Sequence, residues 1–555
     1  MKRFRMLLLG LAAGLTAAGP TLADPVPVSP AITAGLASHD RVTLIVGLVP
    51  PDIDPASGDT ALRQAIHDRQ QAVIDAVGAG ILVDTRYAAV PVLAVQATRD
   101  GLAALQAHPL VVSIAPNRRF GPADAPSRGE LALAPRPIDP IRAAGLPVAS
   151  LTAPAPAGRA STQPQAARPP APTATSRLAQ PDNLRVIGAP AVWSAGHVGA
   201  GQFVAVLDTG VDTAHPAFAG KTVIEACFSG HDPARLNFSL CPGRASAAIG
   251  PGTASNCPET DLVPSCVHGT HVAGIATGND PVAGVYGVAP QADVIAIQVF
   301  HRGWDAKAQA WSIGSDTIDF LAGLDQVASL AQANPGRIAA ANMSLGGGRI
   351  GRFCDADLAG DTEDDGAEIL LVVLNRLRDL NVTTAIAAGN DDYRGELAFP
   401  ACLSPAIAVA ATTPADVFSD NAGTNLAAFP LVFVAAPGDL VLSAIPGGRY
   451  ARFSGTSMAT PMVAGALAVL HAAYPGHRTF DYETALARSG KPLVLDGRYR
   501  LPRLDLTAAD AMLAGNLAIG SLSGSYQPSS PVSYVQSPAY GNQAWSWYKH
   551  QLYVP

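Results

Sequence analysis

Short apolar runs that alternate with amphipathic helical patterns constrain the fold of this chain most strongly. Five runs rich in β-branched and small residues carry no charge, as expected of parallel strands covered on both faces. They are residues 203–207, 294–299, 338–343, 382–387 and 407–411. Helical patterns such as 317–333 and 367–380 lie between them. We therefore predict a doubly wound, mostly parallel α/β domain over residues 181–515, with its sites beyond the carboxyl ends of the strands.

Residues 1–23 have the three-part form of a secretory signal. A basic start precedes an apolar run over residues 6–18, and Thr21-Leu22-Ala23 offers a small-residue cleavage site. The run is shorter than the roughly 20 residues that a membrane helix needs, so we expect removal on export rather than an anchor. No span is expected in the mature form, which we predict to be secreted, periplasmic or at the cell surface.

The even number of cysteines in a chain expected to be exported favours disulfides over free thiols or metal ligation. They are Cys227, Cys241, Cys257, Cys266, Cys354 and Cys402. We predict that Cys354 pairs with Cys402, because these two flank a different part of the chain from the others. The first four crowd into a 40-residue region, 227–266, and their pairing stays open.

Three further segments are expected outside the α/β domain. Residues 40–120 follow the order strand, helix, strand, helix, strand and predict a small ferredoxin-like α+β unit. Residues 121–180 contain 12 Pro and 16 Ala, and are expected to form a semi-extended linker because recurring prolines interrupt helices. Residues 516–555, rich in Ser, Pro, Gly and aromatic residues, are expected to form a poorly ordered tail.

Ser457 lies in the stretch Gly455-Thr456-Ser457-Met458-Ala459-Thr460-Pro461, directly before the apolar helical run 462–473. A serine so placed lies at the positive end of a helix, beside backbone N–H groups that favour developing negative charge. This suits a nucleophile that attacks a carbonyl. Taken alone, the segment would fit an ordinary capped helix better than a catalytic one.

Two upstream motifs supply partners for this serine. Asp208 ends an apolar run, where a buried carboxylate is costly unless it is paired. His268 begins a helix of small residues, Val267-His268-Gly269-Thr270-His271. A zinc site on both histidines is the lesser alternative, because zinc proteases with such a pair carry glutamate where Gly269 stands. His271 is therefore expected to be a structural hydrogen-bonding residue.

Asn390 follows the apolar run that ends near residue 387, after a glycine. Its side chain would either cap a turn or donate its amide to an oxyanion. The order Asp208, His268, Asn390, Ser457, each in its own motif, resembles the subtilisin-like (subtilase) serine proteases over about residues 182–514. That resemblance implies that Ser457 is the nucleophile, His268 its base, Asp208 the partner of the histidine and Asn390 an oxyanion donor.

The resemblance also implies a strand that pairs with extended polypeptide substrates, and a primary specificity pocket beside it. The implied substrate-binding residues are Ser344, Leu345, Gly346, Gly347 and Ala398. Residues 40–120 match the family's inhibitor-like prosegment in element order, length and position. We therefore expect an autoprocessed zymogen, inhibited by its own prosegment, that acts as a monomer.

The chain departs from the family pattern at a common calcium loop. Ala217 and Pro281 stand where the family usually has an aspartate and an asparagine, so that calcium site is expected to be absent. No cofactor is expected for the chemistry. A structural calcium elsewhere stays open, for example among the acids of residues 355–365, although a solvated acidic loop is the preferred interpretation there. The insertion 227–266 is expected to form a disulfide-pinned surface loop near one edge of the cleft.

We thus predict a secreted serine endopeptidase. The alternatives are a peptide ligase or macrocyclase on the same scaffold, and a catalytically inactive binding module. Nothing in the sequence favours the ligase, and the intact set Asp208, His268, Asn390 and Ser457 argues against the binding module. The net charge of -7, without a long basic run, argues against nucleic acid as a partner.

Overall fold

The computed structural model describes residues 25–52, 58–122, 130–146, 148–149, 151, 183–255, 257, 264–305, 309–351, 354–357, 367–419, 422–427, 433–495 and 499–515. The expected signal sequence and C-terminal tail lie outside these residues, as do most of the acids of residues 355–365.

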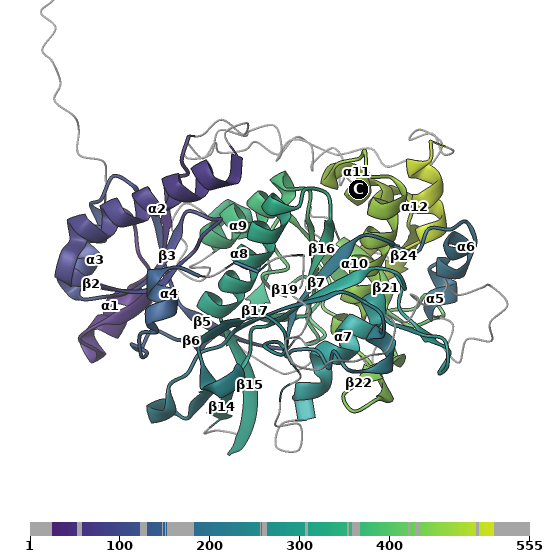
Figure 1. Ribbon diagram of the computed structural model, residues 1–555, viewed down its shortest axis with the longest axis horizontal. Helices are drawn as coiled ribbons and strands as arrows, with labels where there is room; N and C mark the ends of the chain where they lie inside the picture. The colour runs from purple at the N-terminus through teal and green to yellow at the C-terminus, as the bar shows by residue number, and fades with distance from the viewer. Residues whose placement is uncertain are drawn as a thin grey trace, which may run out of the picture.

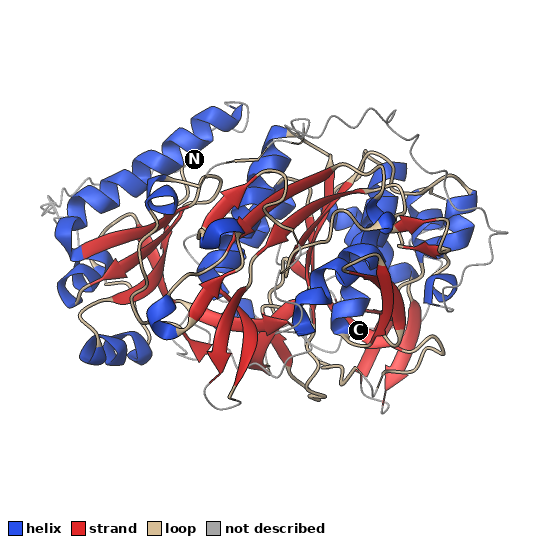
Figure 2. Ribbon diagram, turned by 60° about the horizontal axis from the view of Figure 1, so that its bottom comes forward, coloured by secondary structure: helices blue, strands red, loops and turns tan. Residues whose placement is uncertain are grey.

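A ten-stranded sheet forms the centre of the larger unit (Figures 1 and 2). Its spatial order is β10 (Ala247–Ile249), β8 (Val223–Phe228), β13 (Asp293–Gln298), β7 (Phe203–Asp208), β16 (Ile338–Met343), β18 (Thr383–Ala387), β20 (Ala406–Thr412), β21 (Phe433–Pro437), β25 (Tyr499–Arg503) and β24 (Lys491–Leu495). From β8 to β25 the strands run parallel, and β10 and β24 close the edges in the antiparallel sense. The five predicted apolar runs are the central strands, which confirms the predicted α/β fold class.

Helices cover both faces of this sheet, because alternate residues of each strand point to opposite sides. In β7, Ala205 and Leu207 join one apolar core, whereas Val204 and Val206 join the other. The first core includes α8 (Thr317–Ala333) and α9 (Ala367–Asp379), and the second includes α7 (His268–Thr277), α10 (Thr456–Ala473), α11 (Thr479–Ser489) and α12 (Leu506–Leu513). Strands buried on both sides cannot alternate apolar with polar residues, which explains their bare apolar runs.

The helix α10 is the core helix of this unit. Among the described residues it alone is long and apolar enough to cross a membrane by length and composition, and 89% of that stretch is buried inside the protein. Its apolar surface is therefore covered by the strands and helices around it. A helix that is buried all round has the same apolar composition as a membrane span, which is why α10 meets this criterion.

A smaller α+β unit lies beside the larger one, in purple at the left of Figure 1. Its antiparallel sheet has the order β2 (Ile81–Arg86), β3 (Val92–Ala97), β1 (Val42–Leu48) and β4 (Val111–Pro116), with α2 (Gly58–Val77) and α3 (Arg99–Gln106) in the connections. This βαββαβ order confirms the ferredoxin-like fold. The strand β2 was not predicted, because its second half consists of the polar residues Asp84, Thr85 and Arg86 and the strand forms no long apolar run. The helix α1 (Pro30–Ser38), which buries Ile32 and Leu36, was not predicted either.

The described part of the expected linker does not run freely between the units. β6 (Glu130–Leu131) pairs with β5 (Arg118–Pro122), and α4 (Pro140–Ala144) lies against β2. Arg142 on α4 is 1% exposed, and its guanidinium binds groups of both units. This stretch is fixed by these polar contacts and by Leu133 and Leu146, which pack against the apolar cores.

A third sheet joins the two units. Its order is β19 (Leu397–Phe399), β17 (Leu345–Ile350), β5, β15 (Ala310–Asp316), β14 (His301–Asp305) and β9 (Asn237–Ser239). The strand β5 continues directly from the small unit, yet it pairs antiparallel with β17 and β15 of the large one. The small unit is thus tied to the large one by backbone hydrogen bonds as well as by side chains.

Three disulfides form, and they include the predicted pair Cys354–Cys402. The four cysteines of the 227–266 region pair among themselves, as Cys227–Cys241 and Cys257–Cys266. β9 and β10 lie in this region and extend the edges of the third and central sheets. The insertion is therefore pinned by disulfides, as expected, and also contributes strands.

Small residues let α7 approach the loop after β7. A Cβ added at Gly269 would lie 2.3 Å from the carbonyl oxygen of Gly210 and 3.1 Å from Cβ of Asp208. Both contacts involve atoms held by the sheet or its loop, so the helix itself would have to move. We expect Gly269→Ala to destabilise the protein by about 1–3 kcal/mol. Thermal unfolding followed by circular dichroism measures this loss.

Gly476→Ala is the matched control, because no atom lies within 4 Å of a Cβ added there. Its unfolding temperature should equal that of the unchanged protein. If the Gly269→Ala variant is as stable as the unchanged protein, this result would contradict the close approach of α7 to this loop.

Candidate active site

Asp208 and His268 form a buried pair at one edge of the central sheet. Asp208 is the last residue of β7 and His268 the first of α7, and Nδ1 of His268 lies 2.8 Å from Oδ1 of Asp208. The side chains are 1% and 2% exposed. The same carboxylate oxygen accepts the backbone N–H of Thr209 at 2.7 Å. A carboxylate bound to one ring nitrogen fixes the tautomer and orientation of the imidazole, and stabilises its charged form.

Ser457 is the second residue of α10 and is fully buried. Its Oγ lies 3.5 Å from the carbonyl oxygen of Ser344, and its own carbonyl accepts the hydroxyl of Ser344 at 3.0 Å. Asn342 in turn donates to that hydroxyl oxygen at 3.0 Å. The start of α10 is thus held against the end of β16, with the positive end of the helix dipole at the serine.

Asn390 follows β18 and is tied to the start of α10. Its Oδ1 accepts both the backbone N–H and the hydroxyl of Thr456, each at 2.8 Å. Because the amide oxygen is occupied in this way, the orientation of the NH₂ group is fixed. The NH₂ nitrogen lies 3.1 Å from the position of a Cβ added at Gly455. The amide donor therefore lies beside the turn that precedes Ser457.

The expected substrate-binding residues lie on β17 and on the adjacent β19, except Ser344, which lies between β16 and β17. Gly347 pairs with Phe399, and Ala398 donates its N–H to Ala388 at 2.9 Å. The Ala398 side chain lies 3.3 Å and 3.0 Å from Cβ positions added at Gly346 and Gly389. The absence of a side chain at these two glycines therefore allows the backbone to pack closely against Ala398.

The edge of β17 is occupied by β5. Leu345 is opposite Pro122, and Gly346 is opposite Gly121. The Phe120 side chain, 1% exposed, stacks on Phe399 at 5.7 Å between ring centroids, and meets Phe320 edge-on at 5.5 Å. A segment of the N-terminal region thus lies along this edge as an extended peptide with an aromatic side chain in an aromatic pocket.

Two residues of this site were not predicted from the sequence: Thr456, which fixes Asn390, and Phe320, which completes the aromatic pocket. Ser344 was expected to bind substrate, and its hydroxyl also fixes the start of α10. Thr456 lies directly before Ser457 in its motif, and this position was a signal that could have been used. Phe320 lies inside a helical pattern and looks like any core residue.

His271 has the structural role expected for it. Its Nε2 lies 3.1 Å from the carbonyl oxygen of Ala451, and its ring stacks on Phe453 at 4.3 Å. The structure thus brings Asp208, His268, Asn390 and Ser457 to the strand ends and helix starts at one edge of the central sheet. α10, which carries Ser457, packs along α7, which carries His268.

Comparison with known proteins agrees with this geometry. Residues 199–497 match the model of the subtilase family. The chain is 32% identical over 294 residues to an intracellular serine protease of Paenibacillus polymyxa, covering 52% of this chain and 72% of the relative. It is 29% identical to the major intracellular serine protease of Bacillus subtilis (strain 168), over 52% of this chain and 74% of the relative. It is 30% identical to thermitase of Thermoactinomyces vulgaris, over 56% and 89% respectively.

The match covers the central sheet except β25, the helices from α7 to α11, and all the motifs from the strand β7 to the start of α10. The small N-terminal unit lies outside the matched residues. The chain therefore belongs to the subtilase family and is a subtilisin-like serine endopeptidase that acts on polypeptides.

Proposed function

We propose that the protein is an exported endopeptidase made as an autoprocessed zymogen, with Ser457 as its nucleophile. The observation that carries the proposal is the position of β5, which continues from the small unit and pairs antiparallel with β17 between the two units. An extended segment at that edge occupies the place of a substrate peptide. The chain in this form is thus inhibited by its own N-terminal region.

In the proposed mechanism, Oγ of Ser457 forms a bond to the scissile carbonyl carbon while His268 takes its proton. Asp208 stabilises the imidazolium through its bond to Nδ1. The NH₂ of Asn390 and the backbone N–H groups at the start of α10 bind the oxyanion, where one donor contributes roughly 3–4 kcal/mol. His268 then gives the proton to the leaving amine as the C–N bond breaks. Water releases the acyl group from Ser457 by the same steps in reverse.

The pocket around Phe120 indicates the kind of substrate side chain that this edge accepts. Phe320 and Phe399 hold the ring of Phe120, and β17 holds its backbone neighbours. A peptide that adds as a strand in the same register would place one side chain between these rings. We infer a preference for apolar, and above all aromatic, side chains at that position.

Polar contacts hold the small unit on α8. Both oxygens of Asp325 accept backbone N–H groups of the small unit, from Ala89 at 2.7 Å and Ala88 at 2.8 Å. The hydroxyl of Tyr87 donates to the carbonyl of Ile318 at 3.1 Å, and Arg63 donates to the hydroxyl of Ser329 at 3.1 Å. Apolar contacts accompany these bonds, since Ile45, Val90 and Val92 of the small unit join the same buried core as α8 and α9.

Export is supported by the N-terminal signal pattern and by the disulfides, which persist in oxidising compartments. Two of the relatives are named intracellular proteases, so their names do not set the compartment of this chain. Independence from the common calcium site stays a prediction from Ala217 and Pro281.

We expect Ser457→Ala to leave the precursor uncut, because the residue that attacks the peptide bond is gone. In the unchanged protein the first cut should fall in residues 123–129, directly after the strand that ends at Pro122. Intact mass spectrometry and N-terminal sequencing detect both outcomes. Ser194→Ala, on the outer helix α6 (Ala189–Ser194), is the control and should be processed normally. Normal processing of the Ser457→Ala precursor would disprove autocatalysis.

Asp208→Asn should lower kcat by about 10⁴-fold with little change in KM, because an amide cannot stabilise the imidazolium or hold its tautomer. Initial rates on an aromatic-containing peptide substrate measure both constants. A second His–Asp pair, His197 with Asp510 at 2.6 Å, lies elsewhere in the protein and supplies the control. Asp510→Asn should leave kcat unchanged. Equal loss in the two variants would indicate a general effect on folding rather than on catalysis.

Burial raises the pKa of Asp325 to about 6 from 3.8, although the N–H groups of Ala88 and Ala89 act to lower it. The folded precursor therefore binds more protons than the unfolded chain between about pH 4 and pH 6. The stability contributed by this group is full below about pH 4 and is lost as the pH rises through about 6, by an amount on the order of 3 kcal/mol.

We compare two proteins in the Ser457→Ala background, one with Asp325 and one with Asp325→Asn. The free energy of unfolding of the protein with Asp325, relative to that of the Asp325→Asn variant, should decrease from pH 4 to pH 7. Thermal unfolding of both proteins across this range measures the difference. The exposed Asp68→Asn variant should show no such trend. A difference that stays constant with pH would contradict the raised pKa.

A further inference from the structure

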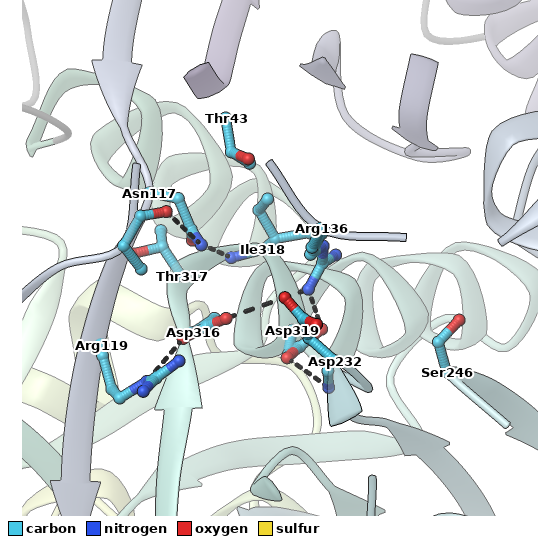
Figure 3. A network of polar contacts seen from close by, with 12 residues as sticks. Thr43, Asn117, Arg119, Arg136, Asp232, Ser246, Asp316, Thr317, Ile318 and Asp319 are labelled. Carbon is cyan, nitrogen blue, oxygen red and sulfur yellow. Dashed lines mark hydrogen bonds and ion pairs between the residues drawn. The ribbon is translucent and has the colours of Figure 1, made fainter. Parts of the chain in front are cut away.

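A second polar cluster lies on the large unit, away from Ser457, where β14, β15 and α8 meet. It consists of His301, Asp316 and Asp319, all at most 5% exposed. One possible ligand atom from each residue lies within 4.8 Å of the others. Figure 3 shows the carboxylates of Asp316 and Asp319 directed towards the same space. The proposed peptidase mechanism uses none of the three.

His301 is the residue that marks this cluster as a site. Both of its ring nitrogens are buried, and neither has a hydrogen-bond partner in the described part of the chain. A buried polar group without a hydrogen-bond partner is destabilising. The imidazole nitrogens of histidine are common metal ligands. An unpartnered imidazole beside two carboxylates is therefore a candidate set of metal ligands.

Arginines of the N-terminal region now neutralise the carboxylates. Nη1 of Arg136 lies 3.5 Å from Asp319 and 4.0 Å from Asp316, and thus bridges the two side chains. Arg142 contacts Asp319 at 2.8 Å, and Arg119 contacts Asp316 at 3.2 Å. Burial raises the pKa of Asp316, but Arg119, His301 and Arg136 outweigh burial and lower it to about 2.

These three arginines account for every ion pair that the described residues make with Asp316 and Asp319, and all three precede residue 152. Arg136 is itself held by the small unit, through two bonds to Asp84 at 2.7 and 2.8 Å. A cut in residues 123–129 separates Arg119 from the large unit, and a further cut after residue 142 is needed to release Arg136 and Arg142. Loss of all three arginines would remove the positive charge and leave two adjacent carboxylates. Such a pair is unstable without a proton or a cation.

We propose that His301, Asp316 and Asp319 form a zinc site that the arginines occupy in the precursor and that the metal occupies after the N-terminal region has left. Imidazole nitrogen and carboxylate oxygen are both zinc ligands, and water can take the fourth position. The nitrogen ligand disfavours calcium and magnesium, which prefer oxygen. The timing of this exchange rests on the proposed processing, but the site itself does not.

The first experiment tests the site without any processing. In the full-length Ser457→Ala precursor, Arg136→Met removes the bridging charge and keeps a long side chain. Equilibrium dialysis with metal analysis should show one additional zinc per chain relative to the precursor with Arg136. Zinc should also raise the unfolding temperature of the Arg136→Met protein. Adding His301→Ala should abolish both effects.

His197→Ala is the matched control, since His197 pairs with Asp510 away from the cluster. It should leave the additional zinc bound. If Arg136→Met does not fold, Arg119→Met in the same background should give the same gain in zinc. A folded arginine variant that binds no additional zinc, or that keeps it after His301→Ala, would overturn the proposal.

The second experiment compares the processed protein with the uncut precursor. Mass spectrometry first establishes whether the N-terminal region has been removed, so a failure of processing is recognised separately. Processed protein should bind one zinc per chain, and His301→Ala or Asp319→Asn should weaken binding at least tenfold. Processed protein whose zinc binding is unaffected by both substitutions would disprove the exchange of arginine for metal.

Discussion

The bond between Asp208 and His268 is the constraint on which the arrangement of the active site depends. Both groups are buried, and each would cost several kcal/mol there without the other. Their contact requires that α7 begin beside the last residue of β7, and Gly269 makes that approach close enough. The start of α10 is fixed separately, by Ser344 and Asn390. Rigid strand ends thus position groups that lie far apart in the sequence.

The catalytic fold was predictable because its signals are local. Five strands appear as bare apolar runs, and the residues at their ends belong to short motifs in which position and chemistry agree. The small unit was predictable in order but not in detail: Asp84, Thr85 and Arg86 form the second half of β2, so this strand shows no long apolar run. The boundaries of the expected segments, in contrast, depend on tertiary contacts that composition does not show.

The region around Arg136 and Arg142 illustrates this limit. Proline and alanine dominate its sequence, so its expected state was an extended linker. Its order comes from two arginines that reach Asp84, Asp316 and Asp319, which are distant along the chain. A single charged residue in a proline-rich stretch gives no sign of whether its partner is water or a buried carboxylate. The aromatic pocket for Phe120 could not be predicted from the sequence either, because Phe320 lies within an ordinary helical pattern.

The insertion of β5 beside β17 has a kinetic consequence for the zymogen that we propose. While the chain is intact, the strand is tethered to the groove that it fills, so its effective concentration there is in the millimolar range or above and does not change with dilution. A cut after Pro122 turns this intramolecular contact into an ordinary bimolecular equilibrium. Activity would then appear when the protein moves from a compartment in which it is concentrated to one in which it is dilute. The time between the cut and the onset of activity would be set by dissociation of the cut strand.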